Sequence, residues 1–199
     1  TADFAPRRLR HPKRTLLLSV LLLALVGAAI AYFATSRTEK GAGSSVTPRT
    51  PGLSVVDLPG RAAKDYDPEG DGEESAGEAQ FAIDGNRTTA WDTETYQGGL
   101  EGSNKGGVGL YVDTETEVAA RQLDLVTSTP HFRAAVYAAN TVSGRIGGWT
   151  KVSPTVKDVR EDQKFELDTA HRRFRYYLVW ITNLPDGGKV DIRELNLEK

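Results

Sequence analysis

Residues 176–181 read Tyr-Tyr-Leu-Val-Trp-Ile, six consecutive aromatic or aliphatic positions that decide the fold class. Successive side chains of a strand point to opposite faces, so a strand that is apolar at every position is buried on both faces. Aromatic and β-branched residues also favour strands. The turn-forming residues 183–188, Asn-Leu-Pro-Asp-Gly-Gly, then end the run. We therefore predict a central strand in a structure of two layers.

The segments around this strand alternate apolar and polar residues with a period of two, and each would bury one face. The alternation is found in 108–112, 121–126, 133–139 and 164–168. A last strand is expected over 190–197, with a change of phase at Arg193 and Glu194 that indicates a bulge or a turned backbone. No helical repeat of three turns follows Leu53. Residues 53–199 are therefore predicted to form one all-β sandwich.

Residues 15–35 form an uncharged stretch of 21 residues, 17 of them apolar. As a helix this stretch would be about 31 Å long, which matches the roughly 30 Å hydrocarbon core of a bilayer. Residues 1–14 carry five basic residues, so the positive-inside rule places the N-terminus in the cytoplasm. We predict a single-pass protein of the plasma membrane with an extracytoplasmic body. The alternative is a cleaved signal peptide, because Ala29-Ile30-Ala31 fits a small-x-small cleavage site.

Residues 36–52 are expected to be a flexible linker, because eleven of these 17 residues are Ser, Thr, Gly or Pro. Its root-mean-square reach would be roughly 20–25 Å, which keeps the body close to the membrane. Residues 15–199 carry 20 basic and 26 acidic residues, which argues against a nucleic-acid-binding surface. The chain contains no Cys, which excludes disulfides, thiolate metal sites and a cysteine nucleophile.

Residues 82–91, Ala-Ile-Asp-Gly-Asn-Arg-Thr-Thr-Ala-Trp, resemble the signature of the discoidin family, also called F5/8 type C or galactose-binding-like domains. Three later segments, 107–113, 175–181 and 192–197, resemble further landmark strands of that family. The resemblance covers about residues 55–199. It implies a jelly-roll β-sandwich.

A narrower resemblance joins Trp91, Thr93 and Tyr96 to the later segments 107–113 and 178–184. This combination is similar to the extracytoplasmic C-terminal domains of actinobacterial membrane proteins, where a cytoplasmic kinase or pseudokinase and one membrane helix precede the domain. Such proteins include receptor Ser/Thr kinases and fusions of a MviN/MurJ-type lipid II flippase to a pseudokinase. Because the chain starts at Thr1 and not at Met, we expect it to be a piece of such a longer protein.

The loop within residues 82–91 carries an Asp, an Asn and a Thr, a set of hard oxygen donors that suits Ca²⁺. The family resemblance implies a structural Ca²⁺ that joins the first core strand to the last. Its implied ligands are the backbone oxygen of Phe81, the side chains of Asp84 and Asn86, the hydroxyl and carbonyl of Thr89, the carbonyl of Arg193 and the carboxylate of Glu194. The alternative is a hydrogen-bonded turn at 84–86 that holds no ion.

Residues 67–78 form a second acidic loop with the spacing of an EF-hand, except for Glu69 at the third position. No helical pattern flanks this loop, so a solvated acidic loop is the favoured interpretation. His131 and His171 show no triad pattern, and the glycine-rich stretch 98–109 leads into a strand rather than a helix. We therefore predict that the chain is not an enzyme.

Sugar-binding sites combine a flat aromatic face with Arg, His or amide donors. Three predicted loops, 96–105, 128–133 and 145–149, contain such residues. Tyr96, His131 and Arg133 are the candidate ligand-binding residues, and the alternative is that they are ordinary surface residues. Trp91, Trp149 and Trp180 are predicted to lie in the core.

Together these observations predict a non-enzymatic extracytoplasmic binding or sensor domain. Its ligand would be a cell-wall carbohydrate such as peptidoglycan, or an envelope protein, and the domain would be coupled to a cytoplasmic kinase or pseudokinase. The alternative is a passive structural or assembly module of a MviN/MurJ-type flippase complex that has no ligand of its own.

Overall fold

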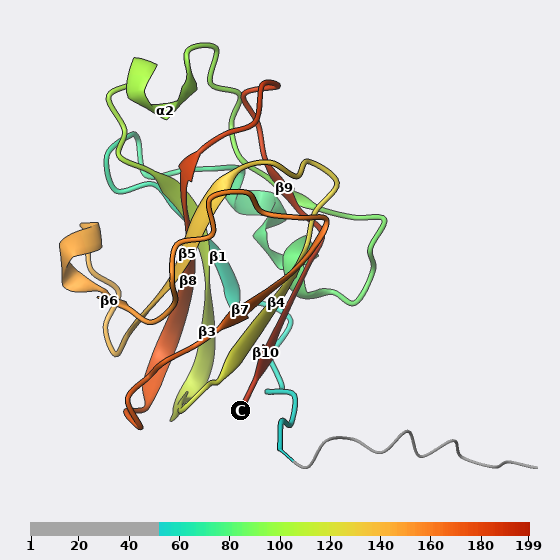
Figure 1. Ribbon diagram of the computed structural model, residues 1–199, viewed down its shortest axis with the longest axis vertical. Coiled ribbons are helices and arrows are strands. Elements are labelled where there is room, and N and C mark those ends of the chain that lie inside the picture. Colours follow the sequence, from blue (N-terminus) through green and yellow to red (C-terminus); the bar gives the residue numbers. More distant parts are fainter. Residues whose placement is uncertain (1–51) are drawn as a thin grey trace, which may run out of the picture. The chain divides into compact units, whose positions relative to one another are not determined.

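The computed structural model describes residues 52–199, which form two antiparallel β-sheets and a short two-stranded ribbon (Figure 1). The larger sheet has the strand order β1-β3-β8-β5-β6. Its strands are β1 (Ala63–Tyr66), β3 (Val108–Val118), β8 (Phe174–Asn183), β5 (Arg133–Ala139) and β6 (Thr150–Lys151). The smaller sheet has the order β10-β4-β7, and its strands are β10 (Glu194–Glu198), β4 (Gln122–Val126) and β7 (Asp162–Glu166). The predicted all-β sandwich is confirmed.

The ribbon pairs β2 (Trp91–Asp92) with β9 (Asp191–Ile192). Three short helical segments complete the described chain: η1 (Ala76–Ile83), α2 (Gly99–Gly102) and η2 (Ile146–Gly148). The sequence pattern did not indicate η1, because an eight-residue 3-10 helix is too short to show a helical repeat.

Strand β8 is the central strand that its apolar sequence predicts, because it pairs with β3 on one side and β5 on the other. Its alternate residues Tyr177, Val179 and Ile181 belong to the main core between the sheets. Leu178 and Trp180 belong to a second cluster on the opposite face of the sheet. Both faces of β8 are therefore buried, one by the main core between the sheets and the other by the second cluster.

The second cluster is covered by the segment that follows β5. The Tyr66 hydroxyl donates a hydrogen bond to the Ser143 carbonyl at 2.7 Å, and the Trp149 Nε1 donates to the Tyr66 hydroxyl at 3.1 Å. Trp91, Trp149 and Trp180 are all buried, as predicted, but only Trp91 lies in the main core.

The predicted change of phase at Arg193 is a change of partner strand. The chain pairs with β2 up to Ile192 and with β4 from Glu194 onward. Between the two ladders, the Arg193 amide donates to the Val126 carbonyl at 2.8 Å. The segment 190–197 therefore forms two short strands, and this switch brings Asp191 and Glu194 to two separate sites.

The predicted basic segment 1–14, the membrane helix 15–35 and all but the last residue of the linker 36–52 lie outside the described residues. Within residues 52–199, no helix combines the length and apolar character needed to cross a membrane.

Candidate functional site

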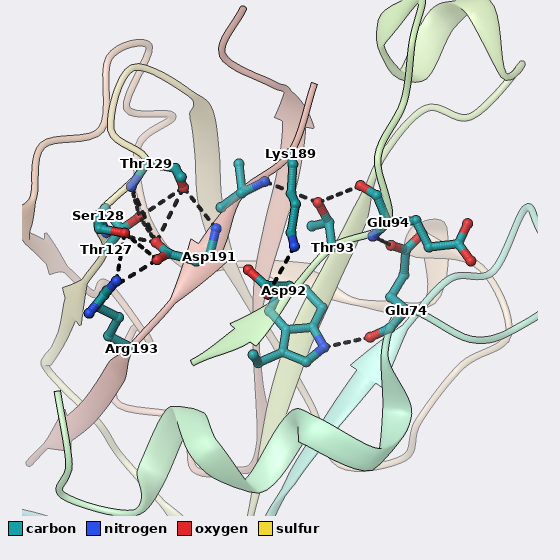
Figure 2. Close-up of polar contacts among 12 residues, drawn as sticks. Glu74, Asp92, Thr93, Glu94, Thr127, Ser128, Thr129, Lys189, Asp191 and Arg193 are labelled. Carbon is teal, nitrogen blue, oxygen red and sulfur yellow. Dashed lines mark hydrogen bonds and ion pairs between the residues drawn. The ribbon is translucent and has the colours of Figure 1, made fainter. Parts of the chain in front are cut away.

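The ribbon of β2 and β9 lies between two networks of polar contacts, each built around a buried carboxylate (Figure 2). On the β9 side the centre is Asp191, and on the β2 side it is Glu74. An ion pair of 3.0 Å joins Asp92 of β2 to Lys189, which lies two residues before β9. These networks fix the loops that follow β4 and β2.

Asp191 is 6% exposed and accepts hydrogen bonds from three consecutive residues after β4. The Thr127 hydroxyl donates at 2.7 Å, the Ser128 amide at 2.6 Å and the Thr129 amide at 3.2 Å, and the Ser128 hydroxyl also donates. The Arg193 Nε completes the set at 3.1 Å. Burial alone would raise the pKa of Asp191, but the donors from Ser128, Thr127 and Arg193 outweigh it and lower this pKa.

Glu74 holds β2 with its backbone and the segment after β2 with its side chain. Its carbonyl accepts from the Trp91 Nε1 at 2.5 Å, and its Oε2 accepts from the Glu94 amide at 2.7 Å. Its Oε1 accepts from the Tyr96 hydroxyl and from the Lys105 Nζ, the latter at 3.2 Å. One buried residue thus ties the acidic loop to the strand that precedes α2.

Lys105 lies outside the acidic loop 67–78 and forms ion pairs with two of its carboxylates, Asp67 and Glu74. Its Nζ lies 2.9 Å from Asp67 Oδ2 and 2.7 Å from the Tyr96 hydroxyl, and the side chains of Asp67 and Glu74 are completely buried. Burial lowers the pKa of Lys105, but its hydrogen bonds to Tyr96, Asp67 and Glu74 outweigh this and raise the pKa. Glu78 is exposed within η1. The prediction of a solvated loop is therefore wrong for Asp67 and Glu74.

Tyr96, one of the three predicted ligand contacts, is 6% exposed and packs in the main core. Burial, followed by the hydrogen bond to Glu74, raises the pKa of its hydroxyl. The side chain is committed to Glu74 and Lys105, so the structure corrects the prediction that Tyr96 faces a ligand. The sequence could not reveal this burial, because Glu74 lies 22 residues earlier in the chain, outside the loop of Tyr96.

His131 and Arg133, the other two predicted contacts, are exposed near the start of β5. The His131 Nδ1 lies 2.9 Å from Asp158 Oδ1, and both side chains are largely exposed. His131 adopts a left-handed backbone with φ of 72°, and Arg133 pairs with Asn183 at the end of β8. The loop that carries them begins at Thr127–Thr129 and is therefore anchored by Asp191.

The predicted calcium loop is shaped by its own side chains. The backbone amide of Asn86 donates to Asp84 Oδ1 at 2.8 Å, and the Thr89 hydroxyl donates to Asp84 Oδ2 at 2.8 Å. Gly85 has φ of 75°, a conformation that glycine adopts without strain. The Arg193 Nη1 donates to the Arg87 carbonyl at 2.9 Å, which joins this loop to the start of β10.

Glu194 is the buried member of the same site. It is 7% exposed, and its Oε2 has no hydrogen-bond partner among the described residues. Burial, followed by the negative charge of Asp84, raises the pKa of Glu194, while the Gly85 amide and Arg87 oppose the rise. A carboxylate that is buried without a partner is costly. Glu194 and Asp84 therefore fit a site for a hard cation.

The rest of the implied donor set is neutral. Asn86 and Thr89 belong to the same loop, Phe81 lies in η1 just before it, and Arg193 adjoins Glu194. Within residues 52–199, no group of three or more His, Cys, Asp or Glu residues could hold a metal. A calcium ion here would thus depend on two carboxylates together with amide, hydroxyl and backbone oxygens, a mixture that Ca²⁺ accepts.

No protein-family model and no curated protein matches the chain. Solved structures do match. A mutant of chitosan-binding module 1 from a Paenibacillus sp. IK-5 chitosanase/glucanase is 17% identical with a TM-score of 0.55, over 74% of this chain and 100% of that one. The family 32 carbohydrate-binding module of C. perfringens NanJ, in complex with galactose, is 18% identical with a TM-score of 0.52, over 74% and 100%.

A truncated AlyQ that contains a family 32 module and an alginate lyase domain is 14% identical with a TM-score of 0.51, over 74% of this chain and 34% of that one. At these identities the likeness concerns the fold. Residues 52–199 have the galactose-binding-like jelly-roll fold, and the predicted discoidin-like architecture is confirmed.

Proposed function

We propose that this chain is a non-enzymatic glycan-binding protein whose jelly-roll domain lies outside the plasma membrane. The observation that carries the proposal is the anchoring of the loop 127–133 by Asp191. A loop fixed before the ligand arrives loses little conformational entropy on binding. The similar modules that bind chitosan or hold galactose show that this fold can present sugar sites, which supports a glycan as the ligand.

In this proposal His131 and Arg133 are the donors to sugar hydroxyl groups. Both are exposed on the anchored loop or directly after it, and neither is needed for the core. The Asp158 carboxylate next to His131 orients the imidazole and adds an acceptor. Tyr96 has no part in this contact, because its hydroxyl is bonded to Glu74 and Lys105.

Calorimetric titration of the full chain in detergent with galactose, chitosan oligomers and muropeptides tests the proposal. We expect saturable binding of at least one of these glycans. The binding should be weaker in the double variant His131→Ala/Arg133→Ala. The matched control is Lys157→Ala/Arg160→Ala, two basic residues on the neighbouring segment that flanks Asp158. Absence of heat with every glycan at millimolar concentration would favour the passive assembly module.

We also propose that Ca²⁺ is a structural cofactor held by Asp84, Asn86, Thr89 and Glu194, with backbone oxygens of Phe81 and Arg193. The unpartnered Glu194 Oε2 supports this proposal. When bound, the ion would neutralise two carboxylates and join η1 to β10. Chelator should lower the melting temperature of the full chain, and Asp84→Ala should remove the difference. Equal melting temperatures with calcium and with chelator would contradict it.

The cellular setting remains part of the proposal. A single membrane helix at 15–35 would hold the domain outside the cell and connect it to a kinase or pseudokinase inside. The reading frame upstream of Thr1 tests this setting. A kinase-like domain there supports a sensor, whereas a flippase without such a domain supports the assembly module.

A further inference from the structure

The outer face of the larger sheet carries an aromatic cluster that the proposed function does not use. Tyr66 on β1, Tyr111 on β3 and Trp180 on β8 lie side by side on this face, together with Trp149. Their rings meet edge to face, with centroids 5.7 Å apart for Tyr66 and Trp180 and 5.5 Å apart for Tyr66 and Trp149. Such a surface would normally be exposed on a two-layer sandwich.

The segment 140–149 covers one part of this cluster and leaves another part open. Tyr66, Trp149 and Trp180 are at most 6% exposed. Tyr111 and Tyr176, whose ring centroids lie 5.9 Å apart, are only half-buried. The open part therefore consists of two neighbouring tyrosines on β3 and β8, next to the edge strand β1.

A groove runs along β1 past these tyrosines. One recess of about 230 Å³ contacts Tyr111, Tyr176 and the exposed Val142, and an adjoining recess of about 590 Å³ extends to Gln80. Arg61, Lys64 and Tyr111 line both recesses. Tyr111 therefore stands in the middle of a groove with an aromatic floor and a charged rim.

Four polar side chains of the groove are available for a ligand. Among the described residues, the hydroxyls of Tyr111 and Tyr176 form no hydrogen bond, and the exposed side chains of Arg61 and Lys64 form no ion pair. Burial, followed by Tyr176, Asp65 and Asp113, raises the pKa of Tyr111. Its hydroxyl therefore stays protonated at neutral pH and can donate.

Arg175 is held in place at the side of the groove. Its Nε and Nη2 each lie 2.7 Å from an oxygen of Asp113, and its guanidinium lies 5.1 Å from the centroid of the Tyr176 ring. This pair neutralises Asp113 and fixes Tyr176. The remaining rim charges, Arg61 and Lys64 against Asp65 and Glu115, balance each other.

We propose that this groove binds an oligosaccharide, with one sugar ring against Tyr111 and Tyr176 and its hydroxyls hydrogen-bonded by Arg61 and Lys64. The inference rests on the proposed function and assigns it a second site on the sheet. The balanced rim gives no attraction to a polyanion, and its charge density disfavours a lipid chain. Aromatic rings beside planar and charged donors suit a neutral, hydroxyl-rich ligand.

Calorimetric titration of the full chain with fully N-acetylated chitosan oligomers, which carry no charge, tests the groove. We expect two sites per chain. Tyr111→Ala should weaken one of them by about tenfold or more, as removal of a central aromatic contact does. Lys64→Ala and Tyr176→Phe should weaken the same site by a few-fold each, and they leave the packing of the cluster intact.

Tyr137→Ala is the matched control, because Tyr137 is half-buried on the same face but outside the groove. The Tyr137→Ala variant should bind the oligosaccharide with the wild-type affinity. Glycan binding that is lost in His131→Ala/Arg133→Ala and unchanged in Tyr111→Ala, Lys64→Ala and Tyr176→Phe would overturn the groove and leave the proposed function intact. No binding by the wild-type chain would overturn both.

Discussion

Asp191 and Glu194 are buried carboxylates only three positions apart, yet their surroundings are opposite. Asp191 accepts hydrogen bonds from Thr127, Ser128, Thr129 and Arg193, and its pKa is lowered. Glu194 has an oxygen without a partner among the described residues, and its pKa is raised by burial and by Asp84. The change of partner strand at Arg193 separates the two environments.

The difference separates a structural carboxylate from one that is available to a ligand. Protein donors satisfy Asp191 completely, so its charge holds the loop 127–129 to β9. The Gly85 amide and Arg87 compensate the charge of Glu194 only in part, and a bound cation would stabilise the fold under that condition. Asp67 and Glu74 differ from both, because their cation is the side chain of Lys105, although Asp67 Oδ1 also has no hydrogen-bond partner among the described residues.

The largest effect is expected where an internal cation is removed. Lys105→Met leaves Asp67 and Glu74 buried without their counter-charge, and the loss of one partner of a buried ion pair costs about 3–5 kcal/mol. Chemical denaturation of the full chain measures this loss. Lys164→Met, which removes an exposed partner of Asp124, is the control and should change stability by less than about 0.5 kcal/mol.

A slightly smaller loss is expected for Asp191→Asn. The amide keeps the shape of the side chain but cannot accept from all its donors, so we expect a cost of about 3 kcal/mol. For a domain of this size the melting temperature should fall by roughly 6–12 °C. Asp162→Asn, on an exposed pair with Arg87, is the matched control. Equal melting temperatures for both variants would show that the hydrogen bonds of Asp191 do not stabilise the fold, and would contradict the contrast between Asp191 and Glu194.

Glu194→Gln should behave in the opposite way when no calcium is present. Because it removes a buried charge whose Oε2 has no hydrogen-bond partner among the described residues, the variant in chelator should be at least as stable as the wild type. In calcium at 100 times its dissociation constant the wild type should gain about 2.7 kcal/mol, and the variant should gain nothing. A loss of stability for Glu194→Gln in chelator would show that protein groups already satisfy this carboxylate.

The smallest effect is expected at the exposed carboxylate of Asp158. Its pair with His131 has side chains that are 75% and 70% exposed, so solvent screens the interaction. Asp158→Asn should change the free energy of unfolding by less than about 0.5 kcal/mol. A larger change would mean that burial does not rank the effects expected at these carboxylates.

The sequence by itself determined the architecture of the folded part. Strand β8 is apolar on both faces, and the other strands alternate apolar and polar residues. The residues of a strand therefore indicate which of its faces are buried. The loop 84–89 was also recognisable, because its donors lie within six residues of one another. The later position of Glu194 came only from the family resemblance.

Only the tertiary structure decided which polar residues are satisfied. Tyr96 contains no local sign of burial, and Lys105 lies 38 residues from Asp67. Asp191 finds its donors 62 to 64 residues earlier in the chain. A residue type states which hydrogen bonds a side chain can form, but whether a partner is present depends on segments that meet only when the sheets pack. The same reason hid the groove at Tyr111, whose second wall comes from β8.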